Sequence, residues 1–265
     1  MKPPVALSIA GSDSGGGAGI VADLKTFEAH GVWGTTAIVA VTAQNTLGVQ
    51  AFDTLAVALV RQQIESVVTD IGVDAAKTGM LASAELVAAV AAAVHDLHVA
   101  NLVVDPVFVS KHGDTLLADD AIGALRDELL PWATVVTPNL PEASGLVGSR
   151  ITDRAGMEAA GRELVGLGPQ VALIKGGHLD GDSSPDCLVA EGAEPVWLEA
   201  ARITGRHTHG TGCVLSAAIA AELARGMEPA DACVAAKRFV EKAIAAGLDL
   251  GGGVGPVNPG WGRDA

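Results

Sequence analysis

The strongest chemical signal in the sequence is residues 209–213 (HGTGC), which open a stretch with helical character up to residue 225. Small residues at a helix start leave the first backbone N–H groups free to face an anion, and the helix dipole adds to the attraction. This arrangement suits the negative charge that develops on a transferring phosphoryl group. Cys213 is expected to have a lowered pKa and to act as an anion ligand or weak base. The alternative is a buried cysteine at a close helix contact.

Oxygen ligands and lysines follow three predicted strands. Asp105 ends one strand, Glu142 lies just beyond the next, and Lys175 ends a third beside two glycines. Mg²⁺ prefers oxygen ligands and keeps several waters, so Glu142 and Asp105 are candidates for a magnesium site. Each carboxylate can instead cap a helix or lie in a solvated turn. Lys175 can reach a nucleotide phosphate, and Lys237 on the last predicted helix is a second candidate, although most lysines are simply solvated.

Residues 11–19 (GSDSGGGAG) form a glycine-rich connection between a strand and a helix. Glycine lets backbone amides approach a ligand closely, but the segment fits neither the dinucleotide fingerprint nor the P-loop. NAD binding is therefore unsupported, and ATP has to be held in another way. The alternative is a tight turn without a ligand.

Gln44 offers a different kind of contact. Its carboxamide has an acceptor and two donors, which complement the adjacent amino group and ring nitrogen of an aminopyrimidine. The alternative is a loop glutamine in water.

These residues are positioned by an alternation of strands and helices, which predicts a mostly parallel central sheet with helices on both faces. Ligands of such sheets bind at the carboxyl ends of the strands, where the unusual residues gather. We expect one α/β domain over residues 1–265, with an irregular, mobile tail at 251–265. The expected strands are 5–10, 36–41, 75–78, 102–105, 135–137, 171–175, and a hairpin of 187–190 with 196–199. The expected helices are 19–29, 57–69, 84–96, 119–130, 154–167, 212–225 and 229–246.

Composition limits the classes of partner. Hydrophobic residues make up 49% of the 265 residues, and the formal net charge is −14 with only 17 lysines and arginines. The chain has enough apolar material for a large core and lacks the basic face that nucleic acid requires. The three cysteines, Cys187, Cys213 and Cys233, match no disulfide or zinc pattern, which favours a reducing cytoplasm. We expect no signal peptide and no membrane span.

A set of ordered motifs runs along nearly the whole chain and resembles the hydroxymethylpyrimidine/phosphomethylpyrimidine kinases of thiamine biosynthesis. The motifs are residues 8–19 (SIAGSDSGGGAG), 22–26 (ADLKT), 42–46 (TAQNT), 77–81 (KTGML), 103–107 (VVDPV), 137–142 (TPNLPE), 175–178 (KGGH), 208–213 (THGTGC) and 255–258 (GPVN). Their number and order make the resemblance highly specific.

The resemblance implies a ribokinase-like fold, an ATP- and Mg²⁺-dependent phosphotransferase acting on a small pyrimidine, and commonly a homodimer. It implies that Gln44 and Asp23 hold the pyrimidine in a pocket lined by Gly11, Met80 and Val107. The nucleotide-binding residues it implies are Asn139, Lys175, Thr208 and Lys237. Asn139 and Glu142 are implied to lie near Mg²⁺ and the ATP phosphates. The anion hole is then Gly210, Gly212 and Cys213; sugar kinases of the superfamily have an aspartate base where Cys213 stands here.

The sequence departs from the family pattern in the loop after Asp105. Phe108 and His112 stand where methionine and serine are expected, in a loop that we expect to cover the active site. The end of the chain after Asn258 is also unusual. Two alternatives stay open: a pyridoxine or pyridoxal kinase on the same fold, and a non-catalytic protein that binds a thiamine precursor. Gln44 favours the aminopyrimidine over a pyridine ring, and the intact residues 210–213 favour catalysis over binding alone.

Overall fold

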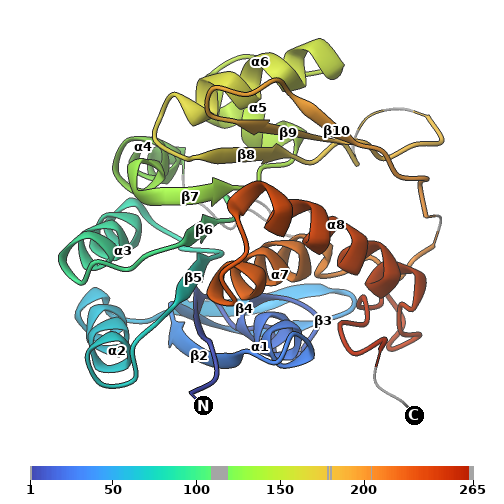
Figure 1. Ribbon diagram of the computed structural model, residues 1–265. Helices are drawn as coiled ribbons and strands as arrows, with labels where there is room; N and C mark the ends of the chain where they lie inside the picture. The colour runs from blue at the N-terminus through green and yellow to red at the C-terminus, as the bar shows by residue number, and fades with distance from the viewer. Residues whose placement is uncertain (1, 109–118, 178, 180, 204, 263–265) are drawn as a thin grey trace.

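The computed structural model describes residues 2–108, 119–177, 179, 181–203 and 205–262. An eight-stranded sheet crosses the molecule in the order β10-β9-β8-β7-β6-β5-β1-β2 (Figure 1). Strands β8, β7, β6, β5, β1 and β2 pair in parallel, while β9 and β10 form an antiparallel edge. The strands are β1 (Val5–Ala10), β2 (Trp33–Ile38), β5 (Ala75–Thr78), β6 (Leu102–Val104), β7 (Ala133–Val136), β8 (Val171–Ile174), β9 (Asp186–Ala190) and β10 (Val196–Leu198).

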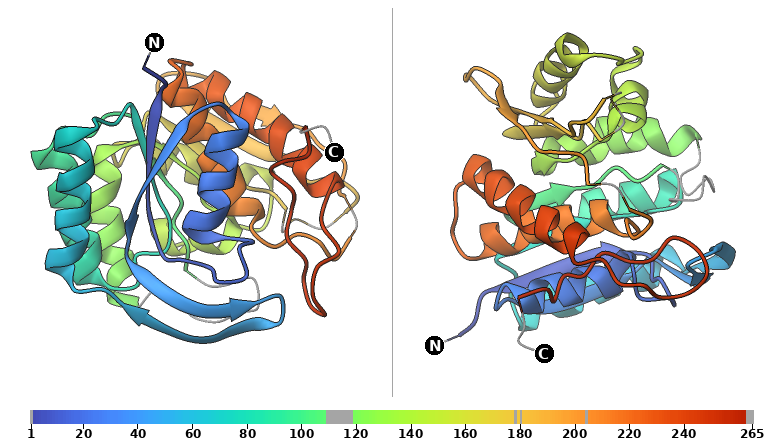
Figure 2. Two further views of the ribbon diagram at one scale, coloured as in Figure 1. Left: turned by 90° about the horizontal axis from the view of Figure 1, so that it is seen from below. Right: turned by 90° about the vertical axis from the view of Figure 1, so that its right-hand side faces the viewer.

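The central strands are apolar because both sheet faces are covered, and every residue of β1, β5, β6, β7 and β8 is buried. One face carries α1 (Gly19–Ala29), α7 (Thr211–Ala224) and α8 (Pro229–Ala245). The other carries α2 (Val57–Asp70), α3 (Ala84–Asp96), α4 (Asp119–Ala124), α5 (Leu140–Val147) and α6 (Arg154–Val165). The two layers are visible on either side of the sheet in Figures 1 and 2. The predicted α/β architecture with a mostly parallel sheet is confirmed.

The chain reverses its direction across the sheet beside β1. It leaves β1 through α1 on one face to reach β2, and returns through α2 on the opposite face to β5, the other neighbour of β1. The carboxyl ends of β1 and β5 therefore flank a topological switch point, where open α/β sheets bind ligands. Gly11 and Met80 follow these two strand ends.

The predicted strand 36–41 is wrong in its bounds. The chain instead forms β2 up to Ile38 and then β3 (Ala40–Asn45), which pairs with β4 (Gly48–Thr54) in a separate antiparallel ribbon. Figure 2 shows this ribbon extending away from the main sheet. Gln44 is consequently a residue of the ribbon, not of a loop after the main sheet.

The remaining elements match the prediction closely, with two local differences. The predicted helix 119–130 is α4 followed by a π turn, Leu125–Leu129, and a short 3₁₀ turn that contains Pro131. Helix α5 was not expected; Pro141 in its first turn fits the helix start there. The β9–β10 hairpin is confirmed.

The end of the chain is irregular, as predicted, but its described part is packed. Val254 donates a backbone hydrogen bond to Thr46 in the turn between β3 and β4 (2.9 Å), and Pro256 pairs with His209. Val257 is buried. These contacts connect the tail to the ribbon and to the start of α7. One continuous main sheet is consistent with a single domain, which stays a prediction.

Candidate active site

The amino end of α7 meets the carboxyl edge of the main sheet. Gly210 adopts a left-handed conformation (φ +81°), and a side chain there would collide with the backbone of Gly17. A Cβ on Gly212 would lie 3.4 Å from Lys175 Nζ and 3.7 Å from Asp105 Oδ2. Glycine is thus required at position 210, and the first turn of α7 lies directly beside a lysine and a carboxylate.

Lys175 lies between two buried carboxylates. Its Nζ is 3.1 Å from Asp105 Oδ1 and 3.7 Å from Glu142 Oε2. Burial alone would lower the pKa of Lys175, but Asp105 and Glu142 raise it above its ordinary value. Burial would raise the pKa of Asp105, yet Lys175 and Lys77 hold it below the usual range. Both groups therefore carry charge at neutral pH.

Glu142 has the opposite balance. Burial and the neighbouring Asp105 raise the pKa of Glu142 to about 7, against the lowering effect of Lys175. The carboxylate also completes a capping box at the start of α5: Glu142 Oε2 accepts from Asn139 N at 2.7 Å, and Asn139 Oδ1 accepts from Glu142 N at 2.9 Å. The capping alternative for Glu142 is thus realised, and it fixes the carboxylate beside Lys175.

The donor set at this edge is compatible with Mg²⁺. No cluster of three or more His, Cys, Asp or Glu side chains suited to a metal occurs in the part of the chain that the structure describes. Magnesium in phosphoryl-transfer sites uses one or two carboxylates together with substrate phosphates and waters. Asp105 and Glu142 supply two such carboxylates on adjoining elements, so they fit an ion that arrives with a nucleotide.

Cys213 lies in the first turn of α7, as expected, but the prediction of a lowered pKa is wrong. Burial raises the pKa of the Cys213 thiol to about 11, with Asp23 and Asp105 adding to the effect and Lys77 opposing it. Desolvation outweighs the helix dipole at this position. The thiol is therefore neutral at physiological pH, which does not favour a role as a base.

The glycine-rich connection is held by its own aspartate. Asp13 accepts hydrogen bonds from the backbone N–H groups of Gly15 (2.8 Å), Gly17 (3.0 Å) and Ala18 (2.8 Å). Its Oδ2 also lies 2.9 Å from His209 Nε2. Three amides that we expected to face a ligand thus bind Asp13 instead, and the segment is a rigid turn packed against the start of α7.

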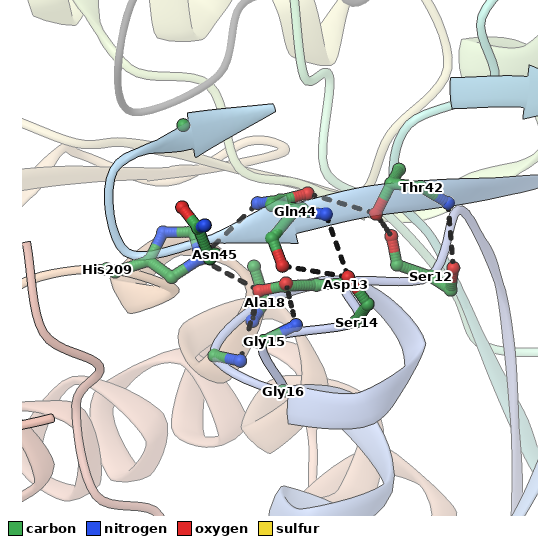
Figure 3. A network of polar contacts seen from close by, with 12 residues as sticks. Ser12, Asp13, Ser14, Gly15, Gly16, Ala18, Thr42, Gln44, Asn45 and His209 are labelled. Atoms are coloured by element: carbon green, nitrogen blue, oxygen red, sulfur yellow. Dashed lines mark hydrogen bonds and ion pairs between the residues drawn. The ribbon is translucent and has the colours of Figure 1, made fainter. Parts of the chain in front are cut away.

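The predicted pyrimidine pocket is brought together in part. A Cβ on Gly11 would lie 2.8 Å from Met80 Cε, so these two residues are in contact across the switch point. The Gln44 carboxamide lies near Thr42 and His209 above the glycine-rich turn (Figure 3). Val107 follows Asp105 at the same sheet edge and is half-buried.

Asp23 forms an internal ion pair in the structure. Its side chain is fully buried in α1, and its carboxylate accepts from Ser8 Oγ (2.6 Å) and Lys77 Nζ (3.0 and 3.2 Å). Burial raises the pKa of Asp23 despite the lowering effect of Lys77. Asp23 is thus the internal counter-ion of Lys77 in the structure, and its predicted contact with the pyrimidine stays a prediction.

The other predicted nucleotide contacts lie at the rim of the site. Lys237 is paired with Asp186 (Nζ to Oδ2, 2.8 Å), and Asp186 also accepts from Gly176 N. Asp186 thus links Lys237 to Gly176, the residue that follows Lys175. Thr208 is half-buried, and its carbonyl accepts from Thr211 Oγ1 at the start of α7. Their roles toward ATP stay predictions.

The loop expected to cover the site is described only at its start. Phe108 packs against α5, where a Cβ on Gly145 would lie 2.6 Å from its ring. His112 lies outside the described residues.

Sequence reasoning missed four polar residues around this site. Two of them contact buried carboxylates: Lys77 pairs with Asp23, and Ser216 Oγ lies 3.2 Å from Asp105 Oδ2. Asp13 and His209 join the glycine-rich turn to α7. Lys77 was detectable as a charged residue in an otherwise apolar strand, but nothing in the sequence paired Asp13 with His209 across 196 positions.

Comparison with known proteins gives one consistent family. The family model described as phosphomethylpyrimidine kinase matches residues 13–258. A hydroxymethylpyrimidine/phosphomethylpyrimidine kinase of Streptomyces coelicolor is 54% identical over 261 residues, covering 98% of this chain and 96% of the relative. The enzyme of that name from Mycobacterium tuberculosis is 49% identical over 260 residues, covering 98% and 94%.

Solved structures share the fold. A pyridoxal kinase of Bacillus subtilis in an ADP complex matches with a TM-score of 0.90 at 39% identity, covering 97% of each chain. A phosphomethylpyrimidine kinase of Clostridium difficile matches with a TM-score of 0.80 at 41% identity, covering 91% of this chain and 99% of the other. No helix among the described residues is long and apolar enough to cross a membrane.

Proposed function

This chain belongs to the phosphomethylpyrimidine kinase family, and from that premise we propose how its site acts. The γ-phosphate of ATP is transferred to the hydroxymethyl oxygen of 4-amino-5-hydroxymethyl-2-methylpyrimidine. The resulting monophosphate then accepts a second phosphate from another ATP, which gives the diphosphate used in thiamine synthesis.

One juxtaposition carries this proposal. The first turn of α7, with Gly212, adjoins Lys175 and Asp105 at the carboxyl edge of the sheet, near the strand ends where Gly11 and Met80 meet. Phosphoryl transfer needs positioning and stabilisation of charge more than covalent chemistry. The N–H groups of α7 and the Lys175 ammonium supply positive potential for the transferring group, while the carboxamide of Gln44 is available to the ring.

As the new P–O bond forms and the bond to the leaving ADP breaks, the acceptor hydroxyl has to give its proton to a base, to an oxygen of the transferring phosphoryl group or to water. The neutral Cys213 thiol is poorly suited to take that proton, since its pKa of about 11 leaves about one thiolate per ten thousand at pH 7. We assign Cys213 to contact the transferring group within the anion hole. Mg²⁺, held by Asp105 and Glu142 with the nucleotide, would neutralise charge on the phosphates.

Product analysis by mass tests the function directly. Purified protein is incubated with Mg·ATP and the hydroxymethylpyrimidine, and in parallel with pyridoxine. The proposal expects the monophosphate followed by the diphosphate of the pyrimidine. Phosphate on pyridoxine alone would assign the chain to vitamin B6 phosphorylation, which the pyridoxal kinase structures at 35–39% identity keep as the second candidate. Binding of the pyrimidine without turnover would make the protein a sensor.

We also propose a homodimer in a reducing cytoplasm. The ribbon β3–β4 exposes Val41, Leu47 and Phe52, with Trp33 exposed on the neighbouring strand β2. An isolated two-stranded ribbon is marginal in water, so a second copy of the chain is the expected cover for these side chains. The reducing compartment is supported by the three cysteines, each of which is free.

A further inference from the structure

A buried pair of side chains, Asp13 and His209, lies next to the carboxamide that the proposed function assigns to the pyrimidine ring. His209 Nε2 is 2.9 Å from Asp13 Oδ2, and the side chains are 7% and 2% exposed. Burial would raise the pKa of Asp13, but His209 and the N–H groups of the glycine-rich turn hold it below its ordinary value. An ionised carboxylate only accepts hydrogen bonds, so His209 Nε2 carries the hydrogen.

The orientation of the Gln44 carboxamide follows from that hydrogen. In the orientation drawn in Figure 3, Gln44 Nε2 faces His209 Nε2 at 3.5 Å, so that two N–H donors oppose each other. On the other side, Gln44 Oε1 lies 3.3 Å from Thr42 Oγ1. The Thr42 hydroxyl has one hydrogen, and the carbonyl of Ser12 at 2.9 Å is its nearer acceptor. Two oxygens with lone pairs therefore also oppose each other.

A rotation of the carboxamide by 180° makes both contacts favourable, because its nitrogen and oxygen exchange places. Gln44 Nε2 then donates to Thr42 Oγ1, and Gln44 Oε1 accepts from His209 Nε2. The single Nε2–H of His209 is shared between Gln44 Oε1 and Asp13 Oδ2. We propose that His209, held by Asp13, sets this orientation of Gln44 and so decides which edge of the substrate ring is recognised. His209 and Asp13 are thus positioning residues. This inference rests on the proposed function.

The pose of the ring is fixed as a consequence. Gln44 presents its oxygen on the His209 side and its nitrogen on the Thr42 side. The exocyclic amino group of the pyrimidine, a donor, lies on the His209 side, and the adjacent ring nitrogen, an acceptor, lies on the Thr42 side. A ring that lacks the amino group leaves the oxygen on the His209 side without its ligand partner, which disfavours binding.

The device is rigid, because His209 is fixed by its backbone as well as by Asp13. The backbone N–H of His209 donates to Gly255 O (3.0 Å), and its backbone carbonyl accepts from Val257 N (3.1 Å). A Cβ on Gly17 would lie 2.5 Å from His209 Cδ2, so the imidazole packs directly on the glycine-rich turn. The imidazole held in this way directs its Nε2–H toward Asp13 and Gln44 before any ligand binds. Such preorganisation is what a residue that determines specificity needs.

Steady-state kinetics of two His209 variants test the proposal. His209→Met has similar bulk and no N–H donor, whereas His209→Gln retains a side-chain N–H. Each is assayed with the hydroxymethylpyrimidine and with its analogue lacking the 4-amino group. For His209→Met we expect KM for the pyrimidine to rise about tenfold, the scale of one lost hydrogen bond, with KM for ATP changed less than about twofold. The kcat/KM preference for the amino substrate should fall about tenfold, and His209→Gln should recover most of it.

An equal loss for both pyrimidines, or no loss, would contradict the positioning role, since a merely structural defect does not alter the preference. The crystal structure of the wild-type complex with the pyrimidine gives a second, independent test. An amino group on the His209 side supports the inference, and an amino group on the Thr42 side overturns it. Failure of the wild-type protein to phosphorylate the pyrimidine would instead reject the proposed function, so the two failures are distinguishable.

Discussion

At the scale of single residues, the site is organised by buried charges that compensate one another. Lys77 pairs with Asp23, and Lys175 with Asp105, within the space below the first turn of α7. Each ion is costly to bury alone, and its partner offsets that cost. The charged groups around this helix start are therefore held in place by the fold before a ligand binds. Cys213 lies at the centre of this arrangement as a neutral thiol.

Replacing Cys213 by alanine should lower kcat about 100-fold, the scale of one lost contact in an anion hole, and should leave the melting temperature close to that of the wild type. Because burial raises the thiol pKa to about 11, we expect the wild-type kcat to be nearly flat between about pH 7.5 and 9.5. A kcat that rises tenfold per pH unit in that range would show that the thiolate is the base. Unchanged turnover in Cys213→Ala would remove the residue from the site.

Replacing Lys77 by methionine should destabilise the fold by about 3–5 kcal/mol, because Asp23 then remains buried without its counter-ion. Adding Asp23→Leu to the same chain should recover part of the loss, since neither position 77 nor position 23 then carries a buried charge. Urea unfolding of the two variants measures both effects. The exposed Lys25→Met serves as the matched control, with an expected change below about 1 kcal/mol. A double variant less stable than Lys77→Met would contradict this coupling of the pair.

At the scale of elements, strand ends and helix starts converge on one edge of the sheet. The capping box of α5 holds Glu142 toward Lys175, and the left-handed Gly210 lets α7 begin against the glycine-rich turn. Both helices therefore direct their amino ends at the site, where an anion is stabilised by their dipoles. The residue that completes the capping box of α5, Glu142, is thus also a proposed ligand of Mg²⁺.

The raised pKa of Glu142 makes stability depend on pH. A carboxyl with a pKa of about 7 in the fold and a lower one when unfolded binds its proton more readily in the folded state. Its stabilising contribution is complete below about pH 4.5 and is lost as the pH rises through about 7. Without nucleotide, we expect the free energy of unfolding of the wild type, relative to Glu142→Gln, to fall by about 1–3 kcal/mol between about pH 5 and 8. Glutamine keeps the capping box, so urea unfolding of the two proteins isolates the charge.

A constant difference between the wild type and Glu142→Gln across this pH range would contradict the raised pKa. A difference that grows in the opposite direction would mean that Lys175 controls the carboxylate and holds it ionised.

At the scale of the whole molecule, the ribbon β3–β4 and the chain end cover the carboxyl edge of the sheet. The tail binds the ribbon through Thr46 and binds the start of α7 through His209. The proposed pyrimidine and phosphate sides of the site are thereby joined by segments far apart in the sequence. Several apolar side chains of the ribbon, Phe52 among them, stay exposed, which is the basis of the proposed dimer.

Replacing Phe52 by serine should weaken the dimer, because it removes an exposed aromatic side chain from the ribbon (48% exposed). Light scattering coupled to size exclusion should show a shift toward monomer at low micromolar concentration. Trp132→Ser is the matched control, since Trp132 is similarly exposed (46%) but precedes the amino end of β7, whereas the ribbon follows the carboxyl end of β2. A wild-type protein that is monomeric at all concentrations would reject the dimer.

The sequence by itself determined the alternation of strands and helices, the glycine starts and the polar residues at strand ends, because periodicity and turn chemistry are local properties. It therefore predicted the central sheet, the start of α7 near Cys213, and the residues Lys175, Asp105 and Glu142. The tertiary structure alone decided how they are paired. Burial raised the Cys213 pKa that the helix start was expected to lower, and it made Asp23 the partner of Lys77. The contact of Asp13 with His209 joins opposite ends of the chain, and desolvation and long-range contacts of this kind exist only after folding.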